Sequence, residues 1–551
     1  MVSPPTKWVL CCTALSLGLC AAQGTVGWAV QGGAFGELAS GNAISPDGLG
    51  GFCVTGKFTG TASFGSTNLT STWIDRWGGY YATDAFVLHV TSARIIDWAV
   101  RVGGAGTTEG RGIAPDGSGG CVATGKFKDA ITFGTTTLTA NAYNHDVFVM
   151  RVTSAGVIDW VTQGGGLDGS TDVCGYGIVP DGLNGYFITG STSGGTATFG
   201  NITLTSSGRN PWSNDVFVMH VKSAGVIDWA IREGGSGRID NSGNIEYAIA
   251  PDGSGGCIVA GRFQGTATFG TFNLTSTGDY DVFVMRVTST GAVGWALKAG
   301  GSYGDRDSVP SIAPDGSGGC FVTSTFYHPY GVGTAMFGST NLTSNRTSRT
   351  DGWAAAFVMH VTNVGAIGWV VQTIDRPSGG GNPDSIASDG SGGCFVTGRL
   401  PYAATFGSTT LTGVSSGSAF VMHMTSAGVI DWAMKVRDAP RAGSALSVYG
   451  ITPDGSGGFA ITGSFRGMIT VGSTNLTSIS SSQYGRNAFV FNLAAPVLEP
   501  SAATATVDPV QQGSGPSPPT TTTAAVVQVE AGGSVRIRAG GTLEIGAIAA
   551  A

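Results

Sequence analysis

Charged residues are scarce in this sequence. Asp, Glu, Lys and Arg make up 11% of its 551 residues, whereas about 25% is usual in soluble domains. The net charge of −7 is spread along the chain, without a cluster of lysine and arginine or an acidic run. The lack of a basic patch argues against a nucleic-acid partner or an anionic membrane surface. No CxxC pair or Cys/His cluster is present, so we expect no metal site and no cofactor.

Long apolar runs are also lacking. The longest, from Trp8 to Cys20, is shorter than the roughly 18 residues that span a bilayer, so we predict no transmembrane segment. Lys7 precedes this run, and small residues follow it up to Ala22. This pattern predicts a signal peptide over residues 1–22 and a secreted protein, extracellular or at the cell surface.

Glycine, in contrast, is abundant, at 92 residues, or more than twice the usual level of about 7%. The chain has no Gly-X-Y period, and 41% of its residues are hydrophobic. Collagen and disorder are therefore excluded, and no segment has a sustained helical period. Short strands joined by glycine-rich turns fit this composition.

One repeat occurs seven times, with a period of 62 to 74 residues. Its signature Ile-x-(Pro/Ser)-Asp-Gly begins at Ile44, Ile113, Ile178, Ile249, Ile312, Ile386 and Ile451. A phenylalanine follows in phase at Phe86, Phe148, Phe217, Phe283, Phe357, Phe420 and Phe489. A tryptophan does the same at Trp28, Trp98, Trp160, Trp229, Trp295, Trp369 and Trp432. Such self-similarity is the mark of a repeat architecture.

Each repeat predicts four strands, which we call a to d. Strand a ends at the isoleucine, and an Asp-Gly turn suited to a tight hairpin leads into strand b. Strand c is of the type Asp-x-Phe-Val-Met-(His/Arg)-Val, and a Thr-Ser-Ala-Gly turn leads into strand d with its tryptophan. A piece such as Thr-Phe-Gly-Ser-Thr-Asn-Leu-Thr lies between b and c and predicts a further hairpin. Four-stranded sheets repeated about an axis are the blades of an all-β propeller.

The two ends of the repeat region complement one another. Residues 26–30 form a strand d with no a, b or c before it, and Asn487 to Leu493 form a strand c with no d after it. We therefore predict a seven-bladed β-propeller over residues 23–493, closed by the N-terminal strand, which removes the free edges of an open array. Residues 494–525 are rich in Ala, Pro and Thr and predict a linker. Residues 526–551 contain an eight-residue echo and predict a short β-rich tail.

The block Asp-Gly-x-Gly-Gly-(Cys/Phe)-Phe-Val-Thr-Gly, followed by Asp-x-Phe-Val, resembles the repeat of the secreted seven-bladed β-propeller (SBBP) family. The resemblance covers roughly residues 25–493. It implies an extracellular or cell-surface propeller and no catalytic residues. The sequence departs from the family pattern in its added Thr-Phe-Gly and Leu-Thr piece.

Cysteine and histidine each recur at one repeat position. Cys121, Cys257, Cys320 and Cys394 fill a position held elsewhere by Phe or Tyr, which predicts buried hydrophobic packing rather than disulfides. Cys53 and Cys174 lie outside that position, and the sequence assigns them no partner. The strand c position of four histidines is filled elsewhere by Arg or Asn, which favours a polar blade contact over a general base or a ring of metal ligands. For the aspartates of the Asp-Gly turns, hairpin capping is favoured over calcium binding. The aspartates that begin the strand c motif, at positions 84, 146, 215 and 281, are expected to be turn residues as well.

The b–c and d–a connections vary between repeats, while the a–b and c–d turns hardly change. The variable connections emerge at one end of the propeller, where function is expected. Aromatic residues in these loops are the candidate ligand-binding residues, namely Trp73, Trp77, Tyr80, Tyr81, Trp212 and Trp353. Exposed aromatic rings suit a glycan or an extracellular protein as partner; the alternative is that they pack over the ring. Glycosylation sequons occur at Asn68, Asn201, Asn273, Asn341, Asn345 and Asn475.

Two classes of function follow. The favoured one is a non-catalytic extracellular recognition or structural propeller, a glycoprotein that binds a glycan or protein through its variable end. The other is a secreted propeller enzyme acting on carbohydrate, a hydrolase or lyase, with carboxylates from the d–a loops. The carboxylates available for this are Asp168, Asp172, Asp240, Glu246, Asp305 and Asp307. No nucleophile or acid/base pair stands out, so no catalytic residue is assigned.

Overall fold

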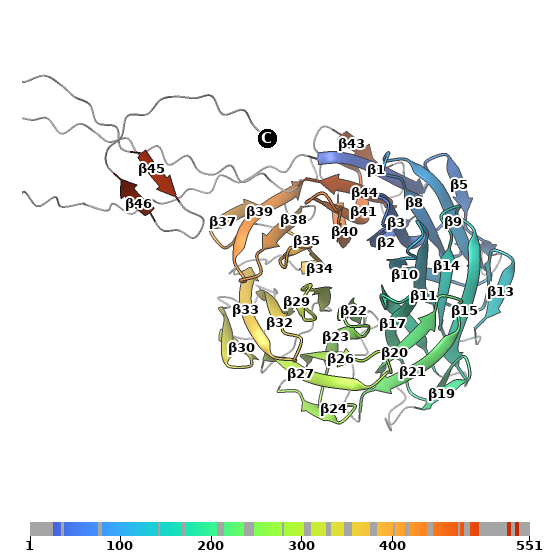
Figure 1. Cartoon of the computed structure of the whole chain (residues 1–551). Helices are drawn as coiled ribbons and strands as arrows, with labels where there is room; N and C mark the ends of the chain where they lie inside the picture. The colour runs from blue at the N-terminus through green and yellow to red at the C-terminus, as the bar shows by residue number, and fades with distance from the viewer. Residues whose placement is uncertain are drawn as a thin grey trace, which may run out of the picture. The chain divides into compact units, whose positions relative to one another are not determined.

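The computed structural model describes residues 26–34, 38–74, 80–140, 144–167, 171–205, 214–235, 247–277, 280–301, 310–326, 332–345, 355–374, 383–400, 403–413, 418–437, 445–471, 474–478, 485–494, 526–529 and 535–538. The predicted signal peptide lies outside these residues. The unit that spans Met1–Val497 contains strands β1 to β44, arranged as seven blades around a central axis (Figure 1). The chain is an all-β, seven-bladed propeller, as predicted. None of the described residues is helical, so the described part of the chain contains no membrane-spanning helix.

Strand a of each blade lines the axis. These strands are β2 (Ala39–Pro46), β10 (Thr108–Pro115), β16 (Val173–Pro180), β22 (Ala248–Pro251), β28 (Ser311–Pro314), β34 (Pro383–Ser388) and β40 (Ala445–Pro453). The b strands are β3 (Phe52–Phe58), β11 (Cys121–Phe127), β17 (Gly185–Thr192), β23 (Cys257–Phe263), β29 (Cys320–Phe326), β35 (Cys394–Arg399) and β41 (Phe459–Arg466). Strand a extends two residues beyond the predicted isoleucine, because the Pro or Ser before the Asp-Gly turn still pairs with strand b.

The outer half of each blade is made by strands c and d. The c strands are β8 (Asp84–Val90), β14 (Asp146–Val152), β20 (Asp215–Lys222), β26 (Asp281–Val287), β32 (Ala355–Val361), β38 (Ala419–Met424) and β44 (Asn487–Leu493). The d strands are β9 (Ile96–Gly104), β15 (Ile158–Gly166), β21 (Ile227–Glu233), β27 (Val293–Gly301), β33 (Ile367–Ile374), β39 (Ile430–Arg437) and β1 (Val26–Ala34). Blades are numbered 1 to 7 from β2 to β40.

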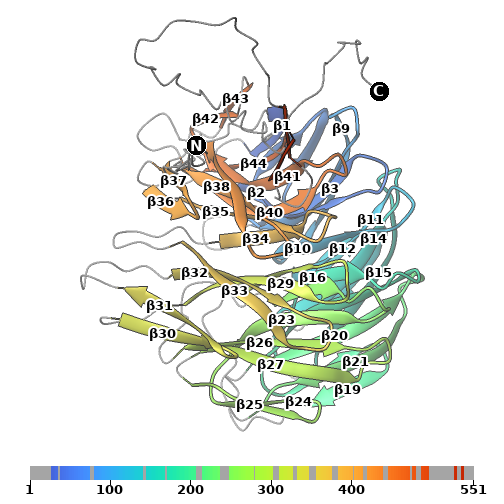
Figure 2. The ribbon, with the colours of Figure 1, turned by 60° about the vertical axis from the view of Figure 1, so that its left-hand side comes forward.

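Blade 7 joins strands from distant parts of the chain. Its order is β40-β41-β44-β1, and β1 pairs antiparallel with β44, with Gln31 opposite Phe489. Figures 1 and 2 both show the blue β1 beside the orange β44. The N-terminal strand therefore completes the blade that the last repeat leaves open.

The inserted piece between b and c is a hairpin in every blade. The hairpins are β4 (Thr61–Phe64) with β5 (Thr67–Thr70), β12 (Ala130–Phe133) with β13 (Thr136–Thr139), β18 (Thr196–Phe199) with β19 (Ile202–Thr205), β24 (Thr266–Phe269) with β25 (Phe272–Thr275), β30 (Val332–Phe337) with β31 (Thr340–Asn345), β36 (Ala403–Phe406) with β37 (Thr409–Thr412), and β42 (Met468–Val471) with β43 (Thr474–Thr477). In four blades the first hairpin strand pairs with strand d of the preceding blade: β4 with β1, β12 with β9, β18 with β15, and β30 with β27. The insertions thus cover strand edges that would otherwise be open.

The hydrophobic core lies between neighbouring blades. Each of its seven clusters draws buried residues from adjacent blades, as where Val87 of blade 1 and Phe148 of blade 2 share one cluster. The six described cysteines are buried free thiols. The core packing predicted for Cys121, Cys257, Cys320 and Cys394 is confirmed, and Cys53 joins the same cluster as Cys121.

A polar network repeats at the end of the propeller that carries the a–b and c–d turns. In blade 1, Asp47 Oδ1 accepts the N–H groups of Leu49 and Gly51 at 2.7 and 2.8 Å, and Asp47 Oδ2 lies 2.9 Å from His89 Nε2. The same pairing of turn and strand c occurs in all seven blades, as His89–Asp47, Arg151–Asp116, His220–Asp181, Arg286–Asp252, His360–Asp315, His423–Asp389 and Asn492–Asp454. The predicted polar blade contact and hairpin cap are therefore one network.

The strand d tryptophans link one blade to the next at this same end. Trp98 stacks on His89 at 5.5 Å, and its Nε1 donates to the backbone oxygen of Ser154 in blade 2, at 3.0 Å. Four more blades repeat the bond, from Trp160, Trp229, Trp295 and Trp369.

The aspartates predicted as turn residues before strand c are strand residues instead. Asp84, Asp146, Asp215 and Asp281 begin strands β8, β14, β20 and β26 and are buried. In blade 1 the carboxylate lies over Gly103 of strand d, where a Cβ atom would come within 2.1 Å of it. The prediction was wrong because it considered only the neighbours of each aspartate in sequence. Gly103, which leaves room for the carboxylate, and Arg101, which pairs with it, both lie on strand d.

The second unit spans Leu498–Ala551 and contains one described hairpin. Strands β45 (Val526–Val529) and β46 (Val535–Arg538) pair antiparallel. Strand β46 forms the last four residues of the first copy of the predicted echo, residues 531–538, and the second copy, residues 539–546, lies outside the described residues.

Candidate functional site at the variable end of the propeller

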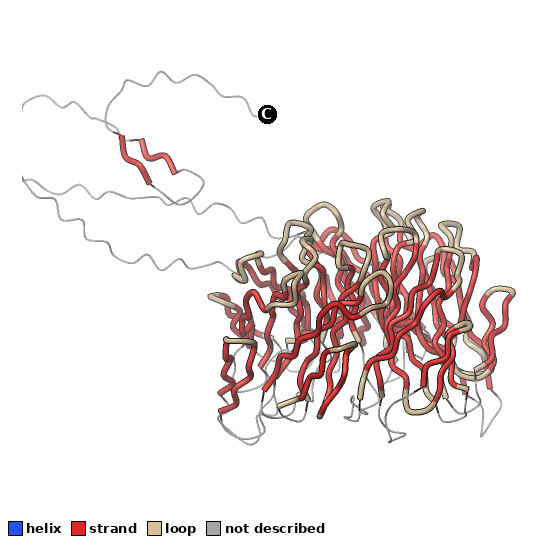
Figure 3. Tube along the Cα trace, turned by 60° about the horizontal axis from the view of Figure 1, so that its bottom comes forward, coloured by secondary structure: helices blue, strands red, loops and turns tan. Residues whose placement is uncertain are grey.

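The two ends of the propeller differ in how much they repeat. One end carries the uniform a–b and c–d turns, which Figure 3 shows in tan along the upper rim. The other end carries the b–c and d–a connections, which differ between blades in length and composition. We call this the variable end.

A central channel of about 700 Å³ runs between the seven a strands. The seven signature isoleucines line it, which explains why this position of the repeat is apolar. Polar residues from the starts of the a strands and the ends of the b strands line the channel toward the variable end. These are Ser40, Asn42, Lys57, Glu109, Arg111, Tyr176, Arg262, Asp384 and Arg399. We call this part the channel mouth.

Three cations of the channel mouth, Lys57, Arg262 and Arg399, share one position of the repeat. The residue near the end of strand b is Lys57, Lys126, Ser191, Arg262, Thr325, Arg399 and Ser464 in blades 1 to 7. Four of the seven blades thus place a cation there. Aligning the repeats reveals this position in the sequence. Only the closed ring of blades brings Lys57, Arg262 and Arg399 to the same channel.

Glu109 is the centre of the ionic contacts in blades 1 and 2. Its carboxylate lies 3.0 Å from Lys57 Nζ and 2.9 Å from Arg111 Nη2, with Lys126 Nζ at 3.9 Å. Burial alone would raise the pKa of Glu109, but the positive charges of Arg111, Lys126 and Lys57 lower it to about 2. One ionised carboxylate is therefore shared by three cations.

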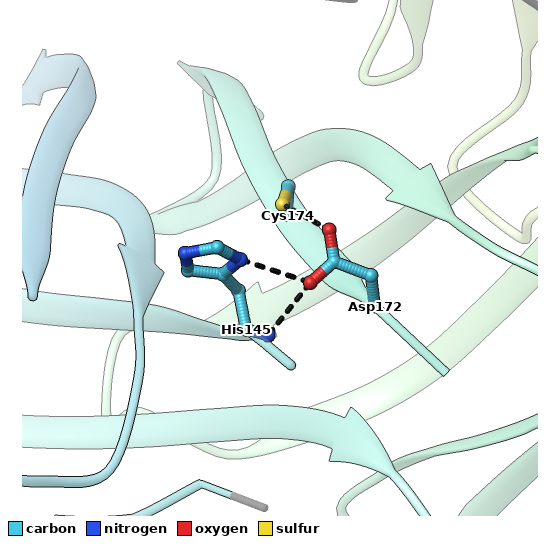
Figure 4. Close-up of side chains that lie close together, drawn as sticks. All are labelled: His145, Asp172 and Cys174. Atoms are coloured by element: carbon cyan, nitrogen blue, oxygen red, sulfur yellow. Dashed lines mark hydrogen bonds and ion pairs between the residues drawn. The ribbon is translucent and has the colours of Figure 1, made fainter. Parts of the chain in front are cut away.

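A second cluster lies where blade 2 meets blade 3. His145 Nδ1 is 2.9 Å from Asp172 Oδ1, and the backbone N–H of His145 donates to the same oxygen at 2.6 Å. Cys174 Sγ is 3.5 Å from the other carboxylate oxygen, Asp172 Oδ2 (Figure 4). Burial would raise the pKa of Asp172, but its bonds to His145 hold it below the usual range. Burial, with the charge of Asp172, raises the pKa of the Cys174 thiol to about 12.

This cluster contains the ligand types of a zinc site, with atoms of all three residues within 4.8 Å of one another. Each residue is, however, already hydrogen-bonded through Asp172, and the charges of Lys126 and Arg111 act on the thiol. The second ring nitrogen of His145 points away from Cys174, so the three do not form a nucleophilic triad (Figure 4). The arrangement is best explained as a hydrogen-bonded anchor of the loop before β16.

Asp146 is a buried carboxylate close to this cluster. Burial and the negative charge of Asp172 raise its pKa to about 7, although it accepts a hydrogen bond from the Gly166 N–H. Its counterparts Asp84, Asp215 and Asp281 pair with the strand d cations Arg101, Arg232 and Lys298. Blade 2 has Gln163 at that position of strand d.

The aromatic loop of blade 1 is partly within the described residues. Strand β6 (Trp73–Ile74) pairs with β7 (Tyr80–Tyr81), and the ring centroids of Trp73 and Tyr81 are 4.9 Å apart, nearly edge to face. Trp73 is 55% exposed. Asp84 anchors the start of the loop by accepting the Thr72 N–H at 3.1 Å. For Tyr80 the structure gives the backbone pairing, and Trp77, Trp212 and Trp353 lie outside the described residues.

Of the remaining predicted site residues, some are described by the structure and others lie outside the described residues. The sequon residues Asn68, Asn201, Asn273, Asn341 and Asn475 are exposed on the b–c hairpins, and Asn345 ends strand β31. Of the d–a carboxylates proposed for an enzyme, Asp172 is described and is bonded to His145. Asp168, Asp240, Glu246, Asp305 and Asp307 lie outside the described residues.

No protein-family model and no curated protein sequence matches the chain. Among solved structures, it is similar to a luciferin-regenerating enzyme, with 9% identity, 70% of this chain and 91% of that chain covered, and a TM-score of 0.28. It is also similar to a rhamnogalacturonan lyase of Bacillus licheniformis, with 11% identity, 83% and 92% covered, and a TM-score of 0.28. Similarity at this level carries no inference about function.

Proposed function

We propose that this chain is a non-catalytic extracellular recognition propeller that binds a glycan through its variable end. The observation that carries the proposal is the exposed Trp73 ring, held against Tyr81 on a paired hairpin at that end. An aromatic ring held in place by neighbouring contacts presents a flat apolar face without a large loss of side-chain entropy on binding. Sugar rings present complementary apolar faces flanked by hydroxyl groups.

The channel mouth offers a set of fixed polar groups at the same end of the propeller. Ser40 Oγ donates to Asn42 Oδ1 at 3.0 Å, and Asn42 Nδ2 donates to the Gly110 backbone oxygen at 2.8 Å. These bonds hold side-chain amide and hydroxyl groups in fixed orientations, as in binding sites that select a ligand by a few polar contacts. A protein partner is the second possible ligand of this end.

The test uses the full-length secreted protein on a glycan array. Trp73→Ala should weaken binding at least tenfold, because burial of one large aromatic side chain contributes roughly 1.5–3 kcal/mol. The melting temperature should remain that of the wild type, because Trp73 is largely exposed. Leu183→Ala is the matched control, since Leu183 is 75% exposed in an a–b turn at the opposite end and should bind normally.

Three outcomes would contradict the proposal. Unchanged glycan binding by Trp73→Ala would place the site elsewhere, and an unfolded variant would make Trp73 a packing residue. Cleavage of the bound glycan would support the secreted carbohydrate-active enzyme instead.

A further inference from the structure

The b strands of neighbouring blades meet through one repeated pair of side chains. The position held by Cys, Phe or Tyr near the start of strand b is followed by a second position of the same strand. The second position of one blade and the first position of the next blade lie in the same core cluster, once in each of the seven clusters. Between blades 6 and 7 the rings of this pair, Phe395 and Phe459, have their centroids 5.1 Å apart. The repeat thus fixes which side chains face one another between blades.

Six of the seven pairs contain at least one large apolar side chain. Three of these pairs include a cysteine, and they are Phe187–Cys257, Ile258–Cys320 and Phe321–Cys394. In the three pairs without cysteine, the first position is filled by Tyr186, Phe459 and Phe52. A cysteine at the first position therefore packs against a large partner in blades 4, 5 and 6, where it acts as a small apolar side chain.

The pair between blades 1 and 2 is different, because both of its members are cysteines. Cys53 of strand β3 and Cys121 of strand β11 are fully buried in one core cluster. Their thiols lie close enough for a hydrogen bond between them. A disulfide requires two cysteine side chains that point toward one another over a short distance, and thiols in contact meet this requirement. Among the other described cysteines, Cys174 instead contacts the carboxylate of Asp172.

We infer that Cys53 and Cys121 form a disulfide that joins blade 1 to blade 2 and stabilises the ring. The bond closes the chain between strands β3 and β11. Such a crosslink stabilises a fold mainly by restricting the unfolded chain, and the effect grows with the length of the closed loop. The predicted secretion would carry the chain through an oxidising compartment, where disulfides form and persist. This crosslink does not depend on the glycan binding proposed for the variable end.

The bond forms by exchange with a disulfide oxidant such as oxidised glutathione. The thiolate of one cysteine attacks the oxidant and releases one thiol, and the thiolate of the second cysteine then displaces the other and forms the Cys53–Cys121 bond. Two cysteine thiols are oxidised, and the oxidant takes up two electrons and two protons to become two thiols. In the folded protein, burial and the contact with Cys53 raise the pKa of the Cys121 thiol well above its usual range, and neither cysteine is exposed. Exchange therefore takes place during folding, before blades 1 and 2 pack together.

The experiment refolds the full-length protein from denaturant, once with oxidised and reduced glutathione and once with dithiothreitol. Remaining thiols are then alkylated under denaturing conditions, and the protein is digested. Mass spectrometry of the oxidised sample should identify a peptide that contains Cys53 linked to a peptide that contains Cys121. The melting temperature of the oxidised protein should exceed that of the reduced protein by about 5 °C, because the closed loop is long.

Cys121→Ala and Cys257→Ala are a matched pair, because the two residues hold the same repeat position and are equally buried. The difference between the oxidised and reduced melting temperatures should vanish in Cys121→Ala and persist in Cys257→Ala. Circular dichroism establishes that each variant is folded, and Cys53→Ala replaces Cys121→Ala if the latter unfolds. Alkylation of both Cys53 and Cys121 in the oxidised sample, linkage of either one to a different cysteine, or equal melting temperatures of the oxidised and reduced wild type would each overturn the inference.

Discussion

At the scale of single residues, the same repeat position is used for different purposes in different blades. The first residue of strand c is an aspartate in four blades and pairs with a strand d cation in three of them. In blade 2 the cation is replaced by Gln163, and Asp146 remains buried with its pKa raised to about 7. Blade 1 shows the effect of the cation, because the pKa of Asp84, although raised by burial, reaches only about 6 beside Arg101.

Restoring the missing cation should therefore stabilise blade 2 at high pH. In the folded protein the pKa of Asp146 is raised above its ordinary value of 3.8. The stability that the protonated carboxyl contributes to the fold is therefore complete below pH 3.8 and is lost as the pH rises through about 7. Gln163→Arg should lower the pKa of Asp146 by about one unit, worth about 1.4 kcal/mol at pH 8. Urea unfolding of wild type and variant at pH 5 and pH 8 measures this difference. A gain of equal size at both pH values would show that the pKa of Asp146 is not responsible.

At the scale of elements, the b–c hairpins close the outside of the blades and carry sequons. Asn68 and Asn273 lie on the second hairpin strands, β5 and β25, where their side-chain oxygens accept bonds from Ser63 at 2.6 Å and Thr268 at 2.7 Å. These asparagines are exposed. The Asn-Leu-Thr segment is therefore both part of the hairpin and accessible from solvent.

Expression in a eukaryotic secretory pathway should place glycans on some of these sequons. The expected sites are Asn68, Asn201, Asn273, Asn341 and Asn475. Intact mass spectrometry before and after glycosidase treatment measures occupancy, and Asn→Gln variants assign each site. The absence of any mass shift would mean that Asn-Leu-Thr serves the hairpin alone.

At the scale of the whole molecule, stability depends on closing the ring. Strand β1 pairs with β44 on one edge and with β4 of blade 1 on the other. Trp28 and Val30 pack against the core cluster between blades 7 and 1. This one strand therefore joins the last blade to the first.

Deletion of residues 25–33 should destabilise the entire propeller. It would expose the edge of β44 and the apolar surface that Trp28 covers, and both neighbouring blades would lose contacts. Differential scanning calorimetry should record a lower melting temperature than that of the wild type, with deletion of part of the predicted linker, residues 500–520, as the control. An unchanged melting temperature would show that the ring closes without β1.

The sequence by itself determined the fold of this protein. Its signature recurs seven times, and a strand d at residues 26–30 matches the strand that the last repeat lacks. The cysteine and histidine positions were predicted correctly for the same reason, since a position that accepts Cys, Phe or Tyr must be packed, and one that accepts His, Arg or Asn must contact a polar group.

The tertiary structure alone decided which polar residues meet. Lys57, Glu109 and Lys126 belong to two repeats, and they meet because neighbouring blades place the ends of b strands beside the start of an a strand. The surroundings of Asp84 and its counterparts are glycines and cations of strand d, which are distant in sequence. A prediction from the local turn pattern therefore assigned these aspartates wrongly. A repeat pattern determines each blade because the relevant contacts are local and periodic, whereas the channel mouth depends on non-periodic substitutions whose distances are set only when the ring closes.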